Sequence, residues 1–320
     1  MDRELPQGFE VRRAGPADAA AVAALVAASQ EAFQGETEIS RASVLRKWRA
    51  PRFDLERDAW LVQTEDGHVI AFGAVREAGV GGQFEGNFTV HPDYYGRGVA
   101  AYLLGRLEER VRAAATERSK GPGVLHTWTG ADNTAERDLF AQAGYRRIAV
   151  FSRMEKALDD EIAEPDWPPG IEPRSFRRGV DDLAVYTALV EAFGEDSGDL
   201  GADAGDWSRD VVADPRADPY LWLLACEGDE VAGVTINSLT GGRGVIERLA
   251  VRPSWQGRGV GGALLRGAFA VLRRRGAHRA VLAVELDVAV EALDLYRRAG
   301  MTEVRRIEFY EKRIAPAMEL

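Results

Sequence analysis

Gln256-Gly257-Arg258-Gly259-Val260-Gly261 is a glycine-rich turn between two regular segments. Residues 244–251 before it are rich in apolar and β-branched types and predict a strand. Residues 259–275 after it carry apolar side chains at a spacing of about 3.6 residues and predict a helix. Glycines let a backbone direct its amides toward one point, and a helix amino terminus adds a positive dipole end. The turn therefore predicts a seat for a pyrophosphate.

Two other nucleotide motifs fit this turn less well, and a tight turn without any ligand remains open. The P-loop of NTPases closes with Gly-Lys-Ser or Gly-Lys-Thr, which the chain lacks. The dinucleotide fingerprint G-x-G-x-x-G is matched by Gly257, Gly259 and Gly262, but that fingerprint directly follows its strand in a parallel unit. Here residues 252–256 intervene, and the predicted strands before them follow one another across short turns, as antiparallel strands do. A dehydrogenase is therefore disfavoured.

The chain repeats itself once. Val90-His91-Pro92 and Gly96-Arg97-Gly98-Val99 recur as Val251-Arg252-Pro253 and Gly257-Arg258-Gly259-Val260, each 161 residues later. A shift this long is typical of a duplicated domain rather than a solenoid. Each copy alternates predicted helices with mostly antiparallel strands. We therefore expect two tandem α/β domains (mixed α+β), each a mostly antiparallel mixed sheet flanked by helices.

The length of 320 residues also suits two domains. We expect the first domain at residues 1–160 and the second at residues 171–320. A linker is predicted at residues 161–170, because the run Glu164-Pro165-Asp166-Trp167-Pro168-Pro169-Gly170 cannot form a helix.

Composition argues against several classes of function. Acids outnumber bases by 51 to 41, and the net charge of −10 argues against a nucleic-acid binder. Cys226 is the single cysteine, so no intramolecular disulfide can form, which fits a reducing cytoplasm. The amino terminus lacks the pattern of a signal peptide, and no apolar run is long enough to span a bilayer. The four histidines are scattered, so we expect a cytoplasmic protein with no metal and no membrane partner.

The second copy resembles the GCN5-related N-acetyltransferase (GNAT) family. Its strand, Arg252-Pro253 and the turn are similar to the acetyl-CoA motif of that family. Ala292-Leu293-Asp294-Leu295-Tyr296 followed by Ala299-Gly300-Met301 resembles the family signature A-x-x-L-Y-x-x-x-G-F. The tandem arrangement is similar to that of mycothiol synthase and its relatives. The resemblance implies an acetyl-CoA-dependent N-acetyltransferase that acts on the primary amine of a small molecule by direct attack. An acyl-CoA-binding regulatory protein without turnover, or a protein N-acetyltransferase, is the alternative.

The resemblance also implies a site in the second copy. Tyr296 matches the general acid of the family, and a tyrosine stays protonated to a pH of about 10; the alternative is an aromatic core residue. Glu247 lies on the strand where similar enzymes carry a base, the alternative being a strand-end carboxylate that faces solvent. Backbone amides near the end of the strand would reach pantetheine and thioester. The implied cofactor-binding residues are Leu249, Ala250, Val251, Gln256, Gly257, Arg258, Gly259, Val260, Gly261 and Gly262.

The first copy departs from the family pattern. Tyr95 stands where the second copy has Gln256, Phe140 replaces the acid tyrosine, and Gly86 aligns with Glu247. We therefore expect the first copy to be non-catalytic, either still holding acetyl-CoA or serving as a scaffold. The candidate second cofactor site consists of Phe88, Thr89, Val90, Gly96, Arg97, Gly98, Val99, Ala100 and Asn133.

One charged segment of the second copy bears on the choice of acceptor. Residues 191–218 contain nine acids and two bases. Such a segment would attract a cationic amine, the alternative being a solvated loop or helix face. We expect a small-molecule amine acceptor, no nucleic acid, and a monomer or homodimer.

Overall fold

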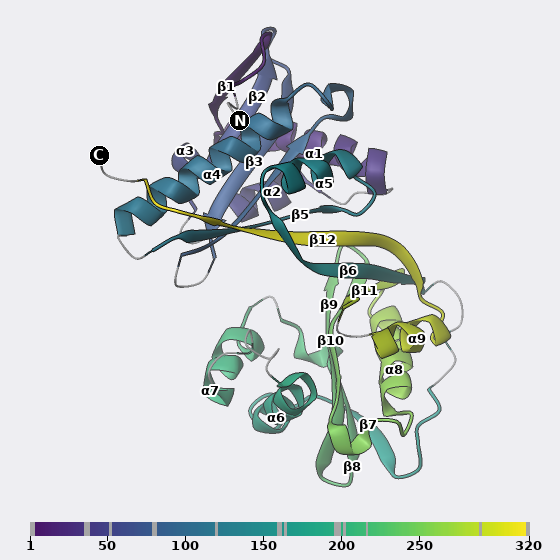
Figure 1. Ribbon diagram of the computed structural model, residues 1–320. Helices are drawn as coiled ribbons and strands as arrows, with labels where there is room; N and C mark the ends of the chain where they lie inside the picture. Colours follow the sequence, from purple (N-terminus) through teal and green to yellow (C-terminus); the bar gives the residue numbers. More distant parts are fainter. Residues whose placement is uncertain are drawn as a thin grey trace. The chain divides into compact units, whose positions relative to one another are not determined.

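The computed structural model describes residues 4–34, 39–50, 53–78, 82–118, 121–158, 162, 165–194, 200, 203–215, 217–287 and 290–317. Two compact units make up the chain (Figure 1). The first domain comprises Met1–Val150 together with Arg305–Leu320, and the second comprises Phe151–Val304. Each is a mixed α/β unit with a mostly antiparallel sheet, so the predicted fold class is confirmed. Within the described residues, no helix is both long and apolar enough to cross a membrane.

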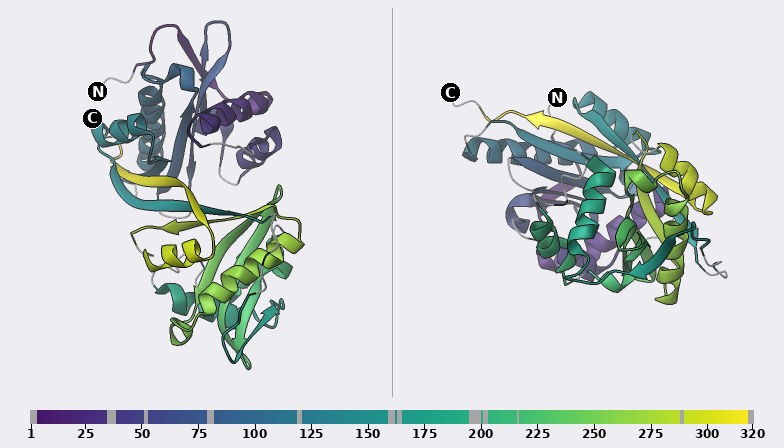
Figure 2. Two further views of the ribbon diagram at one scale, coloured as in Figure 1. Left: turned by 90° about the vertical axis from the view of Figure 1, so that its right-hand side faces the viewer. Right: turned by 90° about the horizontal axis from the view of Figure 1, so that it is seen from below.

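The first domain has a sheet in the order β1-β2-β3-β4-β5-β12. All neighbouring strands pair antiparallel except β4 and β5, which are parallel. Helices α1 and α2 pack on one face, and α4 packs on the other (Figure 2). The elements are β1 (Phe9–Arg13), α1 (Ala19–Gln34), α2 (Arg41–Trp48), α3 (Leu55–Asp58), β2 (Ala59–Thr64), β3 (Val69–Glu77), β4 (Gln83–Val90), α4 (Val99–Arg118), β5 (Gly123–Gly130) and α5 (Thr134–Gln142).

The second domain repeats this plan with the sheet order β6-β11-β10-β9-β8-β7. Here β10 and β11 are the parallel pair. The helix α8 buries an apolar stripe that includes Leu264, Leu265 and Phe269. The elements are β7 (Ile171–Ser175), α6 (Asp182–Phe193), α7 (Ala204–Trp207), β8 (Leu223–Glu227), β9 (Glu230–Thr240), β10 (Arg243–Val251), α8 (Val260–Arg274), β11 (Arg279–Glu285) and α9 (Val290–Arg298).

The last strands of the two repeats are exchanged. The strand β6 (Arg146–Ala157) follows the first repeat but pairs antiparallel with β11 of the second domain. The strand β12 (Thr302–Ile314) follows the second repeat but pairs antiparallel with β5 of the first domain, where it is drawn in yellow in Figure 1. The compact units therefore have other boundaries than the sequence-based division into residues 1–160 and 171–320, because each unit includes part of the last strand of the other repeat. Local sequence predicts that a strand forms, but it does not say which sheet edge the strand joins.

The predicted linker packs on the second domain. Its described residues, 162 and 165–170, form neither helix nor strand, and the others lie outside the described residues. Trp167 joins a cluster with Leu223 and Leu264. A Cβ at Gly267 of α8 would lie 2.4 Å from Leu223 Cδ2 of β8 and 3.3 Å from Trp167 Cζ2 of the linker, so glycine at this position lets both side chains pack closely on the helix.

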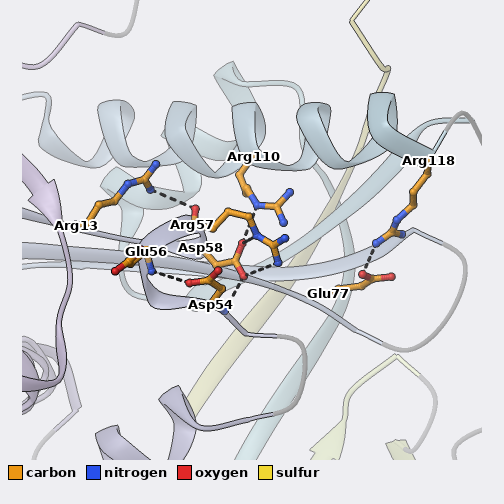
Figure 3. Close-up of polar contacts among 8 residues, drawn as sticks. All are labelled: Arg13, Asp54, Glu56, Arg57, Asp58, Glu77, Arg110 and Arg118. Atoms are coloured by element: carbon orange, nitrogen blue, oxygen red, sulfur yellow. Dashed lines mark hydrogen bonds and ion pairs between the residues drawn. The ribbon is translucent and has the colours of Figure 1, made fainter.

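A buried carboxylate ties α3 to α4 in the first domain (Figure 3). Asp58 is 2% exposed and accepts hydrogen bonds from Arg110 Nε at 2.7 Å, Arg57 Nε at 3.1 Å and the backbone N–H of Asp54 at 2.9 Å. Asp58 is the last residue of α3, and Arg110 extends toward it from α4, so the ion pair joins the two helices. Arg118 and Glu77 form a second ion pair farther along α4.

Asp58→Ala is expected to destabilise the first domain by about 3 to 5 kcal/mol, because it leaves the largely buried Arg110 without its carboxylate. Urea unfolding followed by tryptophan fluorescence would measure the change. Glu56→Ala, which removes an exposed carboxylate on the same helix, should stay within about 0.5 kcal/mol of the unmodified chain. A loss below about 1 kcal/mol for Asp58→Ala would contradict a structural role for this ion pair.

Candidate functional site

The glycine turn presents the amino terminus of α8. After β10 a short 3₁₀ turn (Pro253–Trp255) leads to Gly257 and Gly259, whose φ angles are 72° and 85°. Both lie in the left-handed region that favours glycine. Gly259 is the N-cap of α8 and makes no side-chain cap hydrogen bond. The first amides of a 15-residue helix therefore point out of the turn without a capping side chain.

The side chains of the turn make internal contacts. Gln256 Nε2 donates to the carbonyl oxygen of Val251 at 3.0 Å, which ties the turn to the end of β10. Arg258 pairs with Glu227 at 2.8 Å, and Trp255 Nε1 also donates to Glu227 at 2.8 Å. The hydrogen bond from Arg258, followed by that from Trp255, lowers the pKa of Glu227. Backbone amides are thus the groups that the turn offers to an anion, and Glu227 is a residue that sequence reasoning missed.

The strands β10 and β11 separate beside the turn. Among the described residues, their parallel pairing covers Arg243 to Val245 and stops there, although β10 runs to Val251 and β11 to Glu285. A β-bulge between Ile246 and Arg248 interrupts the pairing of β10 with β9 and contains Glu247. Bulges bend a strand and locally increase its twist. The edge of β10 that faces β11 is therefore free of sheet pairing where the sequence placed the cofactor-binding residues Leu249 to Val251.

The turn, the strand end and the helix that carries Tyr296 meet at Gly261. A Cβ on this residue would lie 3.5 Å from Val251 Cγ2, 3.5 Å from Leu295 Cδ2 and 3.9 Å from Leu249 Cδ2. Val251 and Leu249 come from β10, and Leu295 precedes Tyr296 on α9. The structure therefore brings the predicted cofactor residues and the predicted acid into one region of the second domain.

Tyr296 and Glu247 have different environments. Tyr296 is 9% exposed and belongs to the main core cluster of the second domain, and burial raises the pKa of its hydroxyl. Glu247 is exposed on the bulge. A buried, protonated phenol can donate a proton to a thiolate, and an exposed carboxylate can accept one from an incoming ammonium. Among the described residues, no cluster of three or more metal-ligating side chains was found.

Two family models match the chain: "Acetyltransferase (GNAT) domain" over residues 56–147 and "Acetyltransferase (GNAT) family" over residues 183–301. A mycothiol acetyltransferase of Kineococcus radiotolerans is 33% identical over 291 residues, which cover 88% of this chain and 89% of that protein. A solved GCN5-related N-acetyltransferase from Sphaerobacter thermophilus is 34% identical, with a TM-score of 0.84 over 99% of both chains. The chain belongs to the GNAT acetyltransferase family.

The family resemblance drawn from the turn and the tyrosine signature is thus confirmed, and the chain is an acetyltransferase. Its tandem plan is also found in a solved tandem GNAT protein from the clavulanic acid biosynthesis pathway. That structure has a TM-score of 0.69 over 97% of this chain and all of the other, at 16% identity, and so shows the shared fold alone. GNAT enzymes use acetyl-CoA as cosubstrate.

The first GNAT domain has the same turn and the same separation of strands. Gly96 and Gly98 have φ angles of 74° and 84°, and β4 pairs with β5 over the three residues from Gln83 to Glu85. Gly86, the counterpart of Glu247, is tightly enclosed, because a Cβ there would lie 3.0 Å from Leu125 and 3.1 Å from Val75 and would require both side chains to shift. The first domain therefore carries no carboxylate at that position.

The side chain of Asn87 lies where β4 and β5 separate. Asn87 Nδ2 donates to the carbonyl oxygen of Trp128 on β5 at 3.2 Å, and Asn87 Oδ1 accepts the N–H of Phe88 at 2.8 Å. The amide group of Asn87 thus bridges the two strands and satisfies a peptide N–H on the edge of β4. The counterpart of Asn87 in the second domain is Arg248, which lies over the ring of Phe193 at 5.8 Å.

Other residues of the candidate second cofactor site also have local partners. Asn133 caps α5 by accepting the N–H of Glu136 at 3.2 Å. Glu136 accepts a hydrogen bond from Thr129 Oγ1 at 2.5 Å, and burial raises the pKa of its carboxyl. Tyr95 shares a hydrogen bond of 3.2 Å with Ser29 of α1. The second domain has Ala292 where the first has Glu136.

The acidic segment of the second domain is largely engaged in internal contacts where it is described. Glu191 forms a bidentate ion pair with Arg252, whose Nε donates to Oε2 at 2.7 Å and whose Nη2 donates to Oε1 at 3.0 Å. Asp203 caps α7, and Asp218 accepts the N–H of Tyr220 at 3.1 Å. Residues 195–199, 201, 202 and 216 lie outside the described residues. The described acids thus act in part as caps and ion-pair partners, as the alternative interpretation of a charged segment expects.

Proposed function

We propose that the second domain transfers the acetyl group of acetyl-CoA to the primary amine of a small molecule. The observation that carries the proposal is that β10, α8 and α9 meet at Gly261 of α8, where α9 contributes Leu295, the residue before Tyr296. This arrangement supports one way for acetyl-CoA to lie across the second domain. The pyrophosphate would lie on the amides of residues 257–261, and the pantetheine along the unpaired edge of β10, so that the thioester lies near Tyr296.

Each chemical step then has a candidate group. Glu247 accepts a proton from the ammonium, directly or through a water molecule, which leaves a neutral amine. The amine nitrogen attacks the thioester carbonyl carbon, and backbone N–H groups of β10 stabilise the oxyanion that forms. The C–S bond then breaks with the electron pair on sulfur, and Tyr296 donates its proton to the thiolate. The acylated nitrogen loses its remaining extra proton, which returns Tyr296 to its protonated form, and Glu247 releases its proton to solvent. The products are an amide and free CoA, with no acetyl group bound to the protein.

The names of the relatives reduce the range of acceptors to test first. The Kineococcus radiotolerans relative is named a mycothiol acetyltransferase. An amine related to mycothiol is therefore the first acceptor to test. A general preference for cations has weaker support, because Glu191, Asp203 and Asp218 already have partners within the chain.

The experiment measures release of free thiol from acetyl-CoA against a panel of amines: amines related to mycothiol, amino sugars, aminoglycosides, polyamines, amino acids and peptides. Turnover with one class of small amine supports the proposal. Turnover confined to peptides would favour a protein N-acetyltransferase. Binding of acetyl-CoA without turnover of any amine would favour an acyl-CoA-binding regulatory protein.

We further propose that the second domain alone seats the cofactor and that the first serves as a scaffold. Two features support this. Asn87 already bridges the strands that pantetheine would have to enter, and Glu136 would place a carboxyl group where the second domain has an alanine. The first domain also lacks both the acid and the base, since Phe140 and Gly86 stand at those positions.

A matched pair of glycine variants separates the two sites. Gly257 and Gly96 have φ angles of 72° and 74°, and a Cβ on either would meet nothing within 4 Å. Gly257→Ala strains the left-handed backbone of the turn and should weaken acetyl-CoA binding about tenfold. Gly96→Ala should leave the affinity unchanged. Isothermal titration calorimetry should find about one acetyl-CoA per chain, as one seat requires. A second equivalent that Gly96→Ala removes would show that the first domain also holds the cofactor.

A further inference from the structure

The exchanged strands β6 and β12 occupy equivalent places in the two domains. Ala143-Gly144 precedes β6, Ala299-Gly300 precedes β12, and the two strands align with a shift of 156 residues. Each strand starts in the domain of its own repeat and continues into the other. The change of domain falls at Val150/Phe151 in β6 and at Val304/Arg305 in β12. Two duplicated strands could equally have folded back on their own sheets, so something in the chain must select the exchange.

We infer that the buried carboxylate of Glu308 on β12 selects the exchanged pairing, which makes the first domain the supplier of a strand to the catalytic sheet. Glu308 is 4% exposed and lies opposite Thr129 of β5. Its Oε2 accepts hydrogen bonds from Arg137 Nε at 3.1 Å and from the hydroxyl of Tyr310, and its Oε1 accepts one from Arg147 at 3.2 Å. All of these groups belong to the first domain.

The second domain offers no such partners at the matching positions. The counterpart of Glu308 is Ser152 on β6, which is fully buried. Tyr310 lies on β12 itself and would accompany Glu308 to either sheet, so the partners on other elements decide the pairing. The counterpart of Arg137 is Leu293 on α9, which packs against the apolar core. If β12 lay against β11, its carboxylate would be buried beside a leucine instead of an arginine. A buried charge without its partner is strongly disfavoured, which corresponds to a preference on the order of a hundredfold or more for the exchanged pairing.

The exchange has a consequence for the catalytic domain. The second half of β6, from Phe151 to Ala157, pairs with β11 along the whole length of β11, from Arg279 to Glu285. Met154 of β6 lies in the same core cluster as Tyr296 and Met301, which flank the end of α9. The first repeat therefore supports the helix of the proposed acid through a strand, and it needs no cofactor to do so. The pairing can be tested without any activity measurement, so its failure is distinguishable from failure of the proposed function.

Cysteine cross-linking in the full chain reports the pairing directly. Arg153 of β6 lies opposite Ala283 of β11, and Phe309 is the residue of β12 equivalent to Arg153. Directly opposite residues of antiparallel strands are close enough for a disulfide. In a Cys226→Ala background, R153C/A283C should form a disulfide after refolding and oxidation, and A283C/F309C should not. Cross-linking of the second pair instead of the first would overturn the exchange.

A competition variant tests the role of Glu308. In R153C/A283C/F309C, the cysteine at position 283 chooses between the two strands, and peptide mapping by mass spectrometry gives the ratio of the two disulfides. Glu308→Ser with Arg137→Leu makes the first domain resemble the second at both positions. This change should raise the share of the 283–309 disulfide at least about tenfold after refolding. Glu311→Ser, which removes the partner of Arg146, is the control and should not change the ratio. A ratio unaffected by the Glu308 and Arg137 changes would overturn the inference.

Discussion

Tyr296→Phe is expected to lower kcat by about a hundredfold or more, because general acid catalysis contributes about 10²- to 10⁴-fold. The ring that packs in the core remains, so the helix α9 should keep its place, and the KM for acetyl-CoA should change little. The leaving thiolate must then take its proton from water. Stopped assays of free thiol at saturating acetyl-CoA would measure kcat.

The pH profile separates the acid role from a packing role. Burial raises the pKa of Tyr296, so the hydroxyl remains protonated to a pH above about 10, and the activity of the unmodified enzyme should fall only beyond that pH. The variant should lack this alkaline limb. Tyr220→Phe, at a 72% exposed tyrosine of the same domain, should leave kcat unchanged. A kcat of Tyr296→Phe within about threefold of the unmodified enzyme would refute the acid role.

Glu247→Gln is expected to lower kcat/KM at neutral pH by about a hundredfold, because the acceptor then has to lose its proton to solvent. Glutamine has nearly the same shape as glutamate, so the bulge of β10 should be retained. The loss should shrink as the pH rises toward the pKa of the acceptor amine, where a neutral amine forms without a base. This dependence on pH distinguishes a base from a residue that only positions the acceptor.

The control for this variant is Glu172→Gln, at an exposed glutamate on β7 of the same domain, which should have no effect. A loss that stays constant across the pH range would assign Glu247 to acceptor binding rather than proton transfer. Equal rates for Glu247→Gln and the unmodified enzyme would remove it from the mechanism.

Several features of the site follow from local sequence. Gly257 and Gly259 predict the turn because few other residues adopt positive φ, and the apolar spacing after them predicts α8. The repeat of the same turn 161 residues earlier predicts the second domain copy. Phe140 in place of Tyr296 can be read without coordinates. These properties depend on one residue or one turn of helix, so they are visible in the chain itself.

Other features depend on residues that are far apart in the chain. The contact of Glu227 with Arg258 spans a hairpin and a strand, and nothing near either residue predicts it. Asn87 resembles any polar residue on a strand until β4 and β5 separate and its amide group bridges them. The acidic residues at 191–218 suggested a binding surface, whereas Glu191 is an ion-pair partner of Arg252.

The sequence by itself determined that there are two similar mixed α/β domains, one glycine turn in each, and a tyrosine and a glutamate in the second. The tertiary structure alone decided which domain each last strand completes. The strands β6 and β12 are duplicates with similar propensity and pattern, so local preferences cannot distinguish their two pairings. The difference arises from whether a single carboxylate, Glu308, meets Arg137 or a leucine when it is buried, and that depends on three-dimensional neighbours.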